Sequence, residues 1–124
     1  MAGLDDRAAA QVLAAGRVAV GLALIAVPER VGASWIGPEA AGAGTQVFAR
    51  ALGVRDLALG AGALWALRQG DPARRWLAWG AAADAVDFGA TLGASGIPAR
   101  GKYVTAAIAG GALAAGVRLS RALD

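Results

Sequence analysis

Residues 80–91, GAAADAVDFGAT, decide how this chain folds. Gly80, Asp84, Asp87 and Thr91 are spaced i, i+4, i+7 and i+11, so they share one face of an α-helix. The other positions of this stretch are almost all small or apolar. Because an unpaired charge is costly to bury, an apolar helix with one polar stripe needs partners for that stripe. The stretch therefore predicts a helix whose polar stripe packs against other polar residues.

The composition around this stretch is that of a membrane protein. The chain has 124 residues, of which 57% are hydrophobic and 17% charged, whereas soluble domains have about 25% charged residues. It contains no Cys and no His, which excludes disulfides and removes the commonest metal ligands. We therefore expect no metal and no cofactor, and any acid–base chemistry must use Asp, Glu, Tyr or Lys.

Four apolar segments divide the sequence, and each has about the length that crosses a lipid bilayer. The expected fold is all-α, a single domain over residues 1–124 that forms a four-helix transmembrane bundle. The predicted spans are about 8–27, 45–67, 72–92 and 102–119. The Pro- and Gly-rich connection 28–44 is expected to be a loop with a short interfacial turn around Trp35. A soluble, Ala-rich helical bundle is the alternative.

The basic residues outside the spans indicate the orientation. One side of the bundle holds Arg7, Arg68, Arg74, Arg75, Arg118 and Arg121, and the other holds Arg30, Arg100 and Lys102. An excess of Lys and Arg marks the cytoplasmic side, so we expect a multi-pass protein of the inner (plasma) membrane with both termini in the cytoplasm. The formal charge of +3 does not indicate nucleic acid, because no dense basic run or aromatic platform accompanies it.

Six charged residues fall inside the predicted spans. They are Arg17, Arg50, Arg55, Asp56, Asp84 and Asp87. Counted along the four spans, they occupy one layer between the midplane and the outer half of the bilayer, and their formal charges cancel. A lone charge at the centre of a span costs at least about 2.5–3.5 kcal/mol, so these residues must face inward and pair.

The depths of these residues predict particular pairs. We expect Arg17 to pair with Asp84 or Asp56, and Arg50 to pair with Asp87. Arg50 and Arg55 lie about 140° apart on a helical wheel, so both cannot point at the bundle axis. One of the two must contact another helix, a second protomer or lipid headgroups, and a homodimer is an arrangement that the sequence allows.

The same layer supplies the candidate site. Asp87, Asp84 and Asp56 are the candidate catalytic carboxyl groups, and Arg17, Arg50 and Arg55 would steady developing negative charge on a substrate. Two aromatic residues at the outer level, Tyr103 and Trp35, complete the candidate substrate-binding set. Each of these two is also explained as an interfacial anchor. The position of the layer predicts a pocket open to the outer side.

Two motifs resemble a known family. Residues 50–60, RALGVRDLALG, and residues 84–87, DAVD, are similar to the R-x-x-G-x-R-D-L-x-x-G and D-x-x-D motifs of small four-helix integral membrane proteins in a domain family of unknown function. Arg17 and Pro28 match an Arg and a downstream Pro in the first helix of that family. The resemblance covers roughly residues 15–115. It implies a membrane location and a shared polar centre, and it implies no activity.

Three functions of different class remain open from the sequence. The first is binding or conversion of a small lipophilic molecule by a cofactor-free isomerase, cyclase or hydrolase that uses the Asp residues as acid and base. The second is a proton-coupled or anion carrier. The third is a structural or accessory membrane subunit in which the ion pairs only set the helix register.

Overall fold

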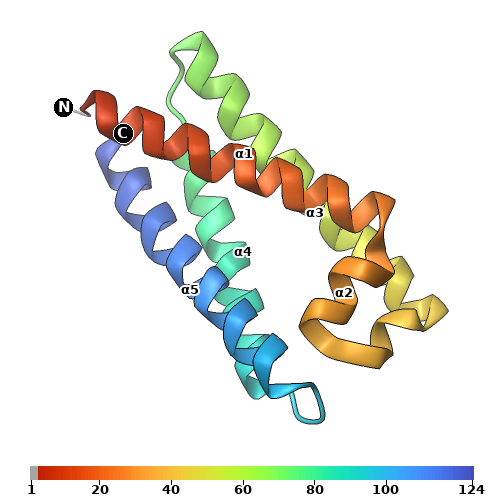
Figure 1. Ribbon diagram of the computed structural model, residues 1–124. Helices are drawn as coiled ribbons and strands as arrows, with labels where there is room; N and C mark the ends of the chain where they lie inside the picture. Colours follow the sequence, from red (N-terminus) through yellow and green to blue (C-terminus); the bar gives the residue numbers. More distant parts are fainter. Residues whose placement is uncertain (1–2) are drawn as a thin grey trace.

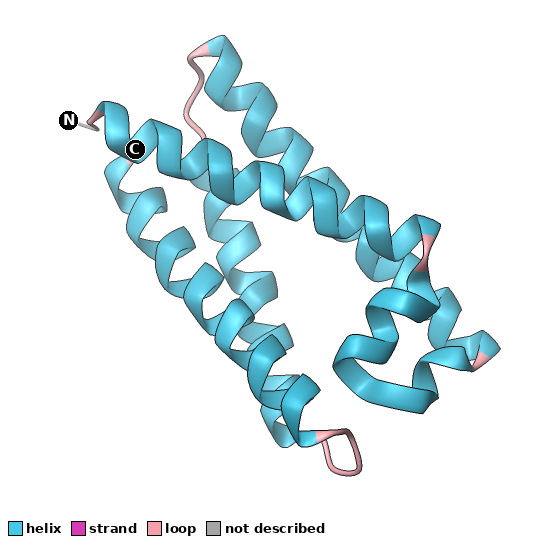
Figure 2. Cartoon of the chain, in the orientation of Figure 1, coloured by secondary structure: helices cyan, strands magenta, loops and turns pink. Residues whose placement is uncertain are grey.

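The computed structural model describes residues 3–124, and this part of the chain is helical throughout, without a strand (Figures 1 and 2). The elements are α1 (Leu4–Ala26), α2 (Pro28–Ile36), the 3₁₀ helix η1 (Gly37–Ala41), α3 (Ala43–Gln69), α4 (Arg74–Gly93) and α5 (Ala99–Ala122). Short loops join them. The prediction of an all-α fold is confirmed, and the four long helices correspond to the four apolar segments of the sequence.

The long helices are arranged as two pairs. Helix α1 packs along α3, and α4 packs along α5. In Figure 1 the two pairs meet near the chain termini and diverge towards the opposite end. Helix α2 lies at the diverging end, where it contacts α1, α3 and α5. The short helix thus bridges the two pairs.

Glycines bring the backbones of α1 and α3 together. A Cβ atom placed on Gly21 would lie 2.6 Å from the carbonyl oxygen of Gly53, and one placed on Gly53 would lie 2.7 Å from the carbonyl oxygen of Gly21. Gly60 meets the Ala14 carbonyl oxygen in the same way, at 2.7 Å. Small residues that permit such close approach are typical of helix contacts in membranes.

The apolar core lies where the two pairs meet. It consists of Ala10, Ala66, Leu67, Ala73, Leu77, Leu119 and Leu123. Polar contacts close the same end: Arg7 donates a hydrogen bond of 2.6 Å to the carbonyl oxygen of Leu67, and Arg118 is ion-paired with Asp6 at 2.6 Å. The termini are therefore held against both pairs.

The connection 28–44 differs from the prediction. It is not a loop, because α2 and η1 occupy residues 28–41. Pro28 stands at the start of α2, where its fixed φ and missing N–H are compatible with the first helical turn. Several of the prolines and glycines that suggested a loop mark helix ends, among them Pro28 and Gly37, which has a φ of 75°, whereas Gly32 lies inside α2.

The exterior is apolar and the interior is made of small residues. Phe48, Trp79 and Ile108 are 78%, 68% and 66% exposed, whereas the buried hydrophobic residues are mostly alanines, with a smaller number of leucines. Two of the helices, α1 and α5, are long and apolar enough to cross a membrane. The charged residues described next lie on α1, α3 and α4.

Candidate functional site

Arg17 of α1 connects the two helix pairs. Its Nη1 atom donates to Oδ1 of Asp56 on α3 at 3.2 Å. Its Nη2 atom donates to Oδ2 of Asp84 on α4 and, at 3.3 Å, to the carbonyl oxygen of Gly80. The Arg17 side chain is only 10% exposed, and those of Asp56 and Asp84 are each 9% exposed. The sequence offered Asp84 or Asp56 as the partner of Arg17, and the guanidinium binds both.

Arg55 of α3 makes the second connection. Its Nη1 and Nη2 atoms donate to Oδ1 and Oδ2 of Asp87, at 3.1 and 2.6 Å. Its Nη2 and Nε atoms also donate to Oδ1 of Asp56, at 3.1 and 3.3 Å. The bidentate geometry with Asp87 is the strong form of an arginine–carboxylate pair.

The predicted pair between Arg50 and Asp87 is wrong. The Arg50 guanidinium donates through Nε to the carbonyl oxygen of Ile25 on α1, at 3.2 Å, and its side chain is exposed. The angle between Arg50 and Arg55 on the helix accounts for this result, since only one of the two can face α4. Arg55 faces α4, and Arg50 contacts α1.

The outer end of the α4 stripe is bound by α2. Trp35 donates from Nε1 to Oγ1 of Thr91 at 3.1 Å, and Thr91 is only 2% exposed. The Trp35 carbonyl lies directly against Gly101 at the start of α5. Trp35 is therefore fixed between α4 and α5 rather than lying free in an interface. All four positions of the stripe, from Gly80 to Thr91, accept a hydrogen bond from another helix.

These contacts form one network. Arg17, Arg55, Asp56, Asp84 and Asp87 are joined without interruption, and we call them the central network. The sequence predicted a neutral layer of three arginines and three aspartates. Since Arg50 lies outside the network, two arginines face three aspartates, and the formal charge is −1. Breaking a buried ion pair on one side leaves an uncompensated charge and typically costs about 3–5 kcal/mol.

Two carboxylate oxygens of the network have no partner. Oδ2 of Asp56 and Oδ1 of Asp84 accept no hydrogen bond from residues 3–124, whereas both oxygens of Asp87 are bonded to Arg55. Asp56 and Asp84 are nevertheless almost fully buried, at 7% and 6% exposed. The network therefore leaves two carboxylate oxygens of its nearly buried aspartates without a hydrogen-bond donor.

Two apolar grooves meet at Arg55. The α2–α3 groove has a volume of about 510 Å³, and its walls include Leu24, Pro28, Trp35, Ile36, Phe48 and Leu52. The α3–α4 groove has a volume of about 480 Å³ and is lined by Ala58, Leu59, Trp79, Ala82, Ala83 and Val86. Arg55 borders both grooves and is the single charged residue in the lining of each. Ligand pockets have volumes of about 300–1,000 Å³ and few polar groups.

Part of the groove lining was not predicted. Phe48, Leu52 and Arg55 follow one another at i, i+4 and i+7, a spacing that places them on one face of α3. This spacing is visible in the sequence, but only Arg55, the charged member of the face, indicates a site by its residue type. No spacing in the sequence predicts that Trp79 lines the α3–α4 groove, because its position there depends on how α4 packs against α3.

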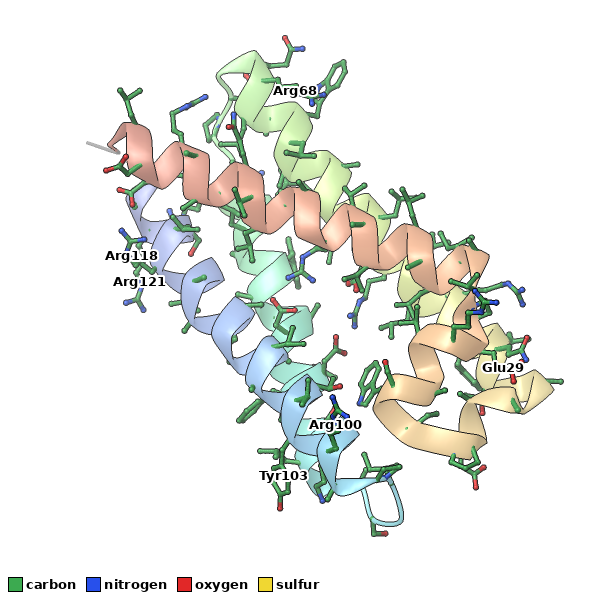
Figure 3. The ribbon with its side chains drawn as sticks, in the orientation of Figure 1. Glu29, Arg68, Arg100, Tyr103, Arg118 and Arg121 are labelled. Atoms are coloured by element: carbon green, nitrogen blue, oxygen red, sulfur yellow. The ribbon has the colours of Figure 1, made fainter. Side chains whose placement is uncertain are left out.

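Tyr103 does not belong to the site. Its side chain is 65% exposed and points outward from α5 in Figure 3. No hydrogen bond joins it to any residue of the described chain. Tyr103, which the sequence placed in the candidate substrate-binding set, therefore does not join the hydrogen bonds of the other site residues, and its exposure agrees with the alternative of an interfacial anchor.

Comparison of this chain with protein-family models, with curated proteins and with solved structures gives no match.

Proposed function

We propose that this chain is an integral membrane protein that spans the bilayer with α1, α3, α4 and α5. The apolar exterior supports this assignment, because large exposed apolar patches on a protein in water mark interaction surfaces or cause aggregation. The interior of Ala and Gly supports it as well, since close backbone contact stabilises helix pairs in lipid. The motif resemblance to small four-helix membrane proteins agrees with this location.

The arrangement of charges supports cytoplasmic termini. In Figure 3, Arg68, Arg118 and Arg121 lie at the end of the bundle that holds the termini, and Glu29 and Arg100 lie towards the diverging end. The excess of arginine at the first end follows the positive-inside rule. Reporter fusions at each terminus test the orientation: both are expected to report the cytoplasm, and opposite locations would exclude four spans.

For the function, we infer that the α2–α3 groove binds a small lipophilic molecule with its polar group against Arg55. The observation that carries this proposal is the position of Arg55, which is the single charged residue lining a groove of about 510 Å³ and is itself held by Asp87 and Asp56. An apolar cavity with one fixed polar group is the usual form of a small-molecule site. The groove lies at the diverging end, which the proposed orientation directs to the outer side.

The contacts of Asp87 favour binding over chemical conversion. A general base must lie within hydrogen-bond distance of the proton that it removes, but Asp87 is not among the residues that line either groove, whereas its partner Arg55 lines both. Conversion of a ligand in the groove by acid–base chemistry would first require a carboxyl group to reach it. We therefore propose a binding protein, with isomerase, cyclase or hydrolase activity as a narrower possibility for the same site.

Filling the groove tests the proposal. Ala51 lines the α2–α3 groove and is exposed, whereas Ala61 is exposed on the same helix outside both grooves. The variants Ala51→Phe and Ala61→Phe therefore add the same side chain inside and outside the groove. The protein is purified from membranes in mild detergent. The small molecules that copurify with it are identified by mass spectrometry, and the amount of each is expressed per mole of protein.

We expect a lipophilic compound that copurifies with the wild type and with Ala61→Phe and is depleted in Ala51→Phe. The same compounds in equal amounts with all three proteins would contradict a site in this groove. Equal helix content by circular dichroism is required of both variants, so that loss of the compound is not confused with loss of the fold.

A structural role is the second candidate, and one observation favours it. Every charged side chain of the central network contacts at least one opposite charge, and residues 3–124 contain no side-chain N or O atom that is sealed from solvent and lacks a hydrogen-bond partner. Such a network also serves to fix helix register. Arg55→Gln separates the two functions: a folded variant that no longer retains the compound supports binding, and a variant that fails to fold supports the structural role.

A further inference from the structure

The central network has a shortage of positive charge. Arg17 and Arg55 face Asp56, Asp84 and Asp87, so one carboxylate has no cation of its own. A charge surrounded by protein and lipid is unfavourable, and a carboxyl group in such a place removes the charge by binding a proton. We infer that Asp84 holds a proton in the folded protein and is an exchangeable proton-binding site. This inference rests on the proposed membrane location and does not depend on whether the grooves bind a ligand.

The hydrogen bonds distinguish Asp84 from the other two aspartates. Asp56 accepts three N–H groups at Oδ1, and Asp87 accepts two in bidentate geometry. Asp84 accepts one, from Arg17 at Oδ2, and its Oδ1 atom is free to carry a proton. Hydrogen bonds donated to a carboxylate favour its charged form. The aspartate with the fewest donors is therefore the one that binds the proton.

No other element supplies the missing charge at Asp84. Helix α1 contributes Arg17, α3 contributes Asp56 with Arg55 behind it, and α4 contributes Asp87. Gly116 of α5 packs against Ala81, and Gly110 packs against the Phe88 ring.

The part of α5 that faces Asp84 therefore lies between residues 110 and 116. This segment, GGALAAG, has no ionisable side chain. Helix α2 contacts α4 through Trp35 at Thr91, two helical turns beyond Asp84, and brings no charge to the network. A proton on Asp84 makes the network neutral without any further group.

The proton couples the network to its surroundings. A cationic group that arrives at Asp87 would supply the third positive charge and release the proton from Asp84. By linkage, the proton and such a cation weaken each other's binding. Asp84 would thus bind or release a proton whenever the pairing of Arg55 with Asp87 changes, although it lies inside the helix packing and outside the lining of both grooves.

Infrared spectroscopy of the full-length protein in lipid bilayers at pH 7 tests the inference. A protonated carboxyl group has a C=O stretching band separate from those of carboxylates and of the peptide bond, and the band shifts in heavy water. Five of the six acidic residues outside the network are exposed, and Asp6 is paired with Arg118. The variants are Asp84→Asn and, as a control at an exposed position, Asp71→Asn.

We expect a band equivalent to one protonated carboxyl group in the wild type and in Asp71→Asn, and its loss in Asp84→Asn. Asp84→Asn should also fold, because an amide replaces a neutral acid and leaves two arginines with two aspartates. A wild-type spectrum without the band overturns the inference whether or not the variant folds. Survival of the band in Asp84→Asn, with its loss in Asp56→Asn or Asp87→Asn, also overturns the assignment to Asp84.

Discussion

The Arg17 guanidinium binds the carboxyl group of Asp84 across helices that otherwise pack in different pairs, α1 with α3 and α4 with α5. The Arg17 guanidinium also binds Asp56 of α3, so one side chain holds three helices. Away from the apolar core near the termini, the two pairs diverge (Figure 1). The central network is therefore the main polar connection that fixes the distance between the pairs midway along the bundle.

Replacing Arg17 should destabilise the protein severely. Arg17→Gln removes the hydrogen bonds to Asp56 and Asp84, both nearly buried, and leaves Arg55 as the single cation of the central network. A buried charge left without its partner costs about 3–5 kcal/mol. The free energy of unfolding is measured in mild detergent by denaturant titration, followed by circular dichroism. Arg121→Gln is the control, because Arg121 is exposed and surface substitutions change stability by about 0.5 kcal/mol or less. Equal stability of the two variants would show that the network does not hold the bundle.

The partner of Asp87 can be established by double-mutant cycles. Arg55→Gln combined with Asp87→Asn should give a coupling energy of about 0.5–3 kcal/mol, the range for residues in one salt-bridge network. Arg50→Gln combined with Asp87→Asn should give a coupling near zero, since Arg50 binds the Ile25 carbonyl instead. A larger coupling for Arg50 than for Arg55 would support the pairing that the sequence suggested and contradict the structure.

The polar stripe of α4 could be predicted from the sequence because it follows from helix periodicity alone. The need of Asp84 and Asp87 for arginine partners followed from the cost of unpaired charges. The prediction of Arg17 as a partner of Asp84 is confirmed. The sequence alone could not show whether Arg50 or Arg55 pairs with Asp87. The rotation of α3 about its own axis determines which of the two arginines faces α4. That rotation is fixed by the close contact of Gly53 and Gly60 with α1, which no local pattern reveals.

The short helix α2 was missed for a related reason. Prolines and glycines are typical of loops, and a nine-residue helix that contains Gly32 and is followed by Gly37 gives a weak helical signal. The helix is stabilised by tertiary contacts, among them the bond from Trp35 to Thr91. The net charge of the network was also mispredicted, since it depends on which arginine points inward.

The bond between Trp35 and Thr91 should hold α2 in place. Thr91→Val keeps the shape of the side chain and removes the acceptor of the 3.1 Å hydrogen bond, which is worth about 0.5–1.5 kcal/mol. We expect faster amide hydrogen exchange in α2 and little change in α3. Thr105→Val is the control, because Thr105 lies in α5 and makes no side-chain hydrogen bond to the described residues. Unchanged hydrogen exchange in α2 would mean that the other contacts of α2 hold this helix in place without the bond from Trp35 to Thr91.

Two glycines of α1 should respond oppositely to the same substitution. A Cβ atom on Gly21 would lie 2.6 Å from backbone atoms of both Gly53 and Leu57, whereas one on Gly16 would have no neighbour within 4 Å. Gly21→Ala must push α3 away and should destabilise the protein by about 1–3 kcal/mol or more, as overpacking does. Gly16→Ala should be neutral or stabilise it by up to about 1 kcal/mol, because alanine favours the helix.

The unfolding free energies of these two variants are compared in the same detergent. Helix propensity acts alike on both, so their difference isolates the contact between α1 and α3. Movement of α3 would also alter the central network, since Arg55 and Asp56 lie on that helix. Gly21→Ala should therefore reduce the coupling between Arg17 and Asp56 as well. If Gly21→Ala is as stable as Gly16→Ala, the two helices are farther apart than the structure has them.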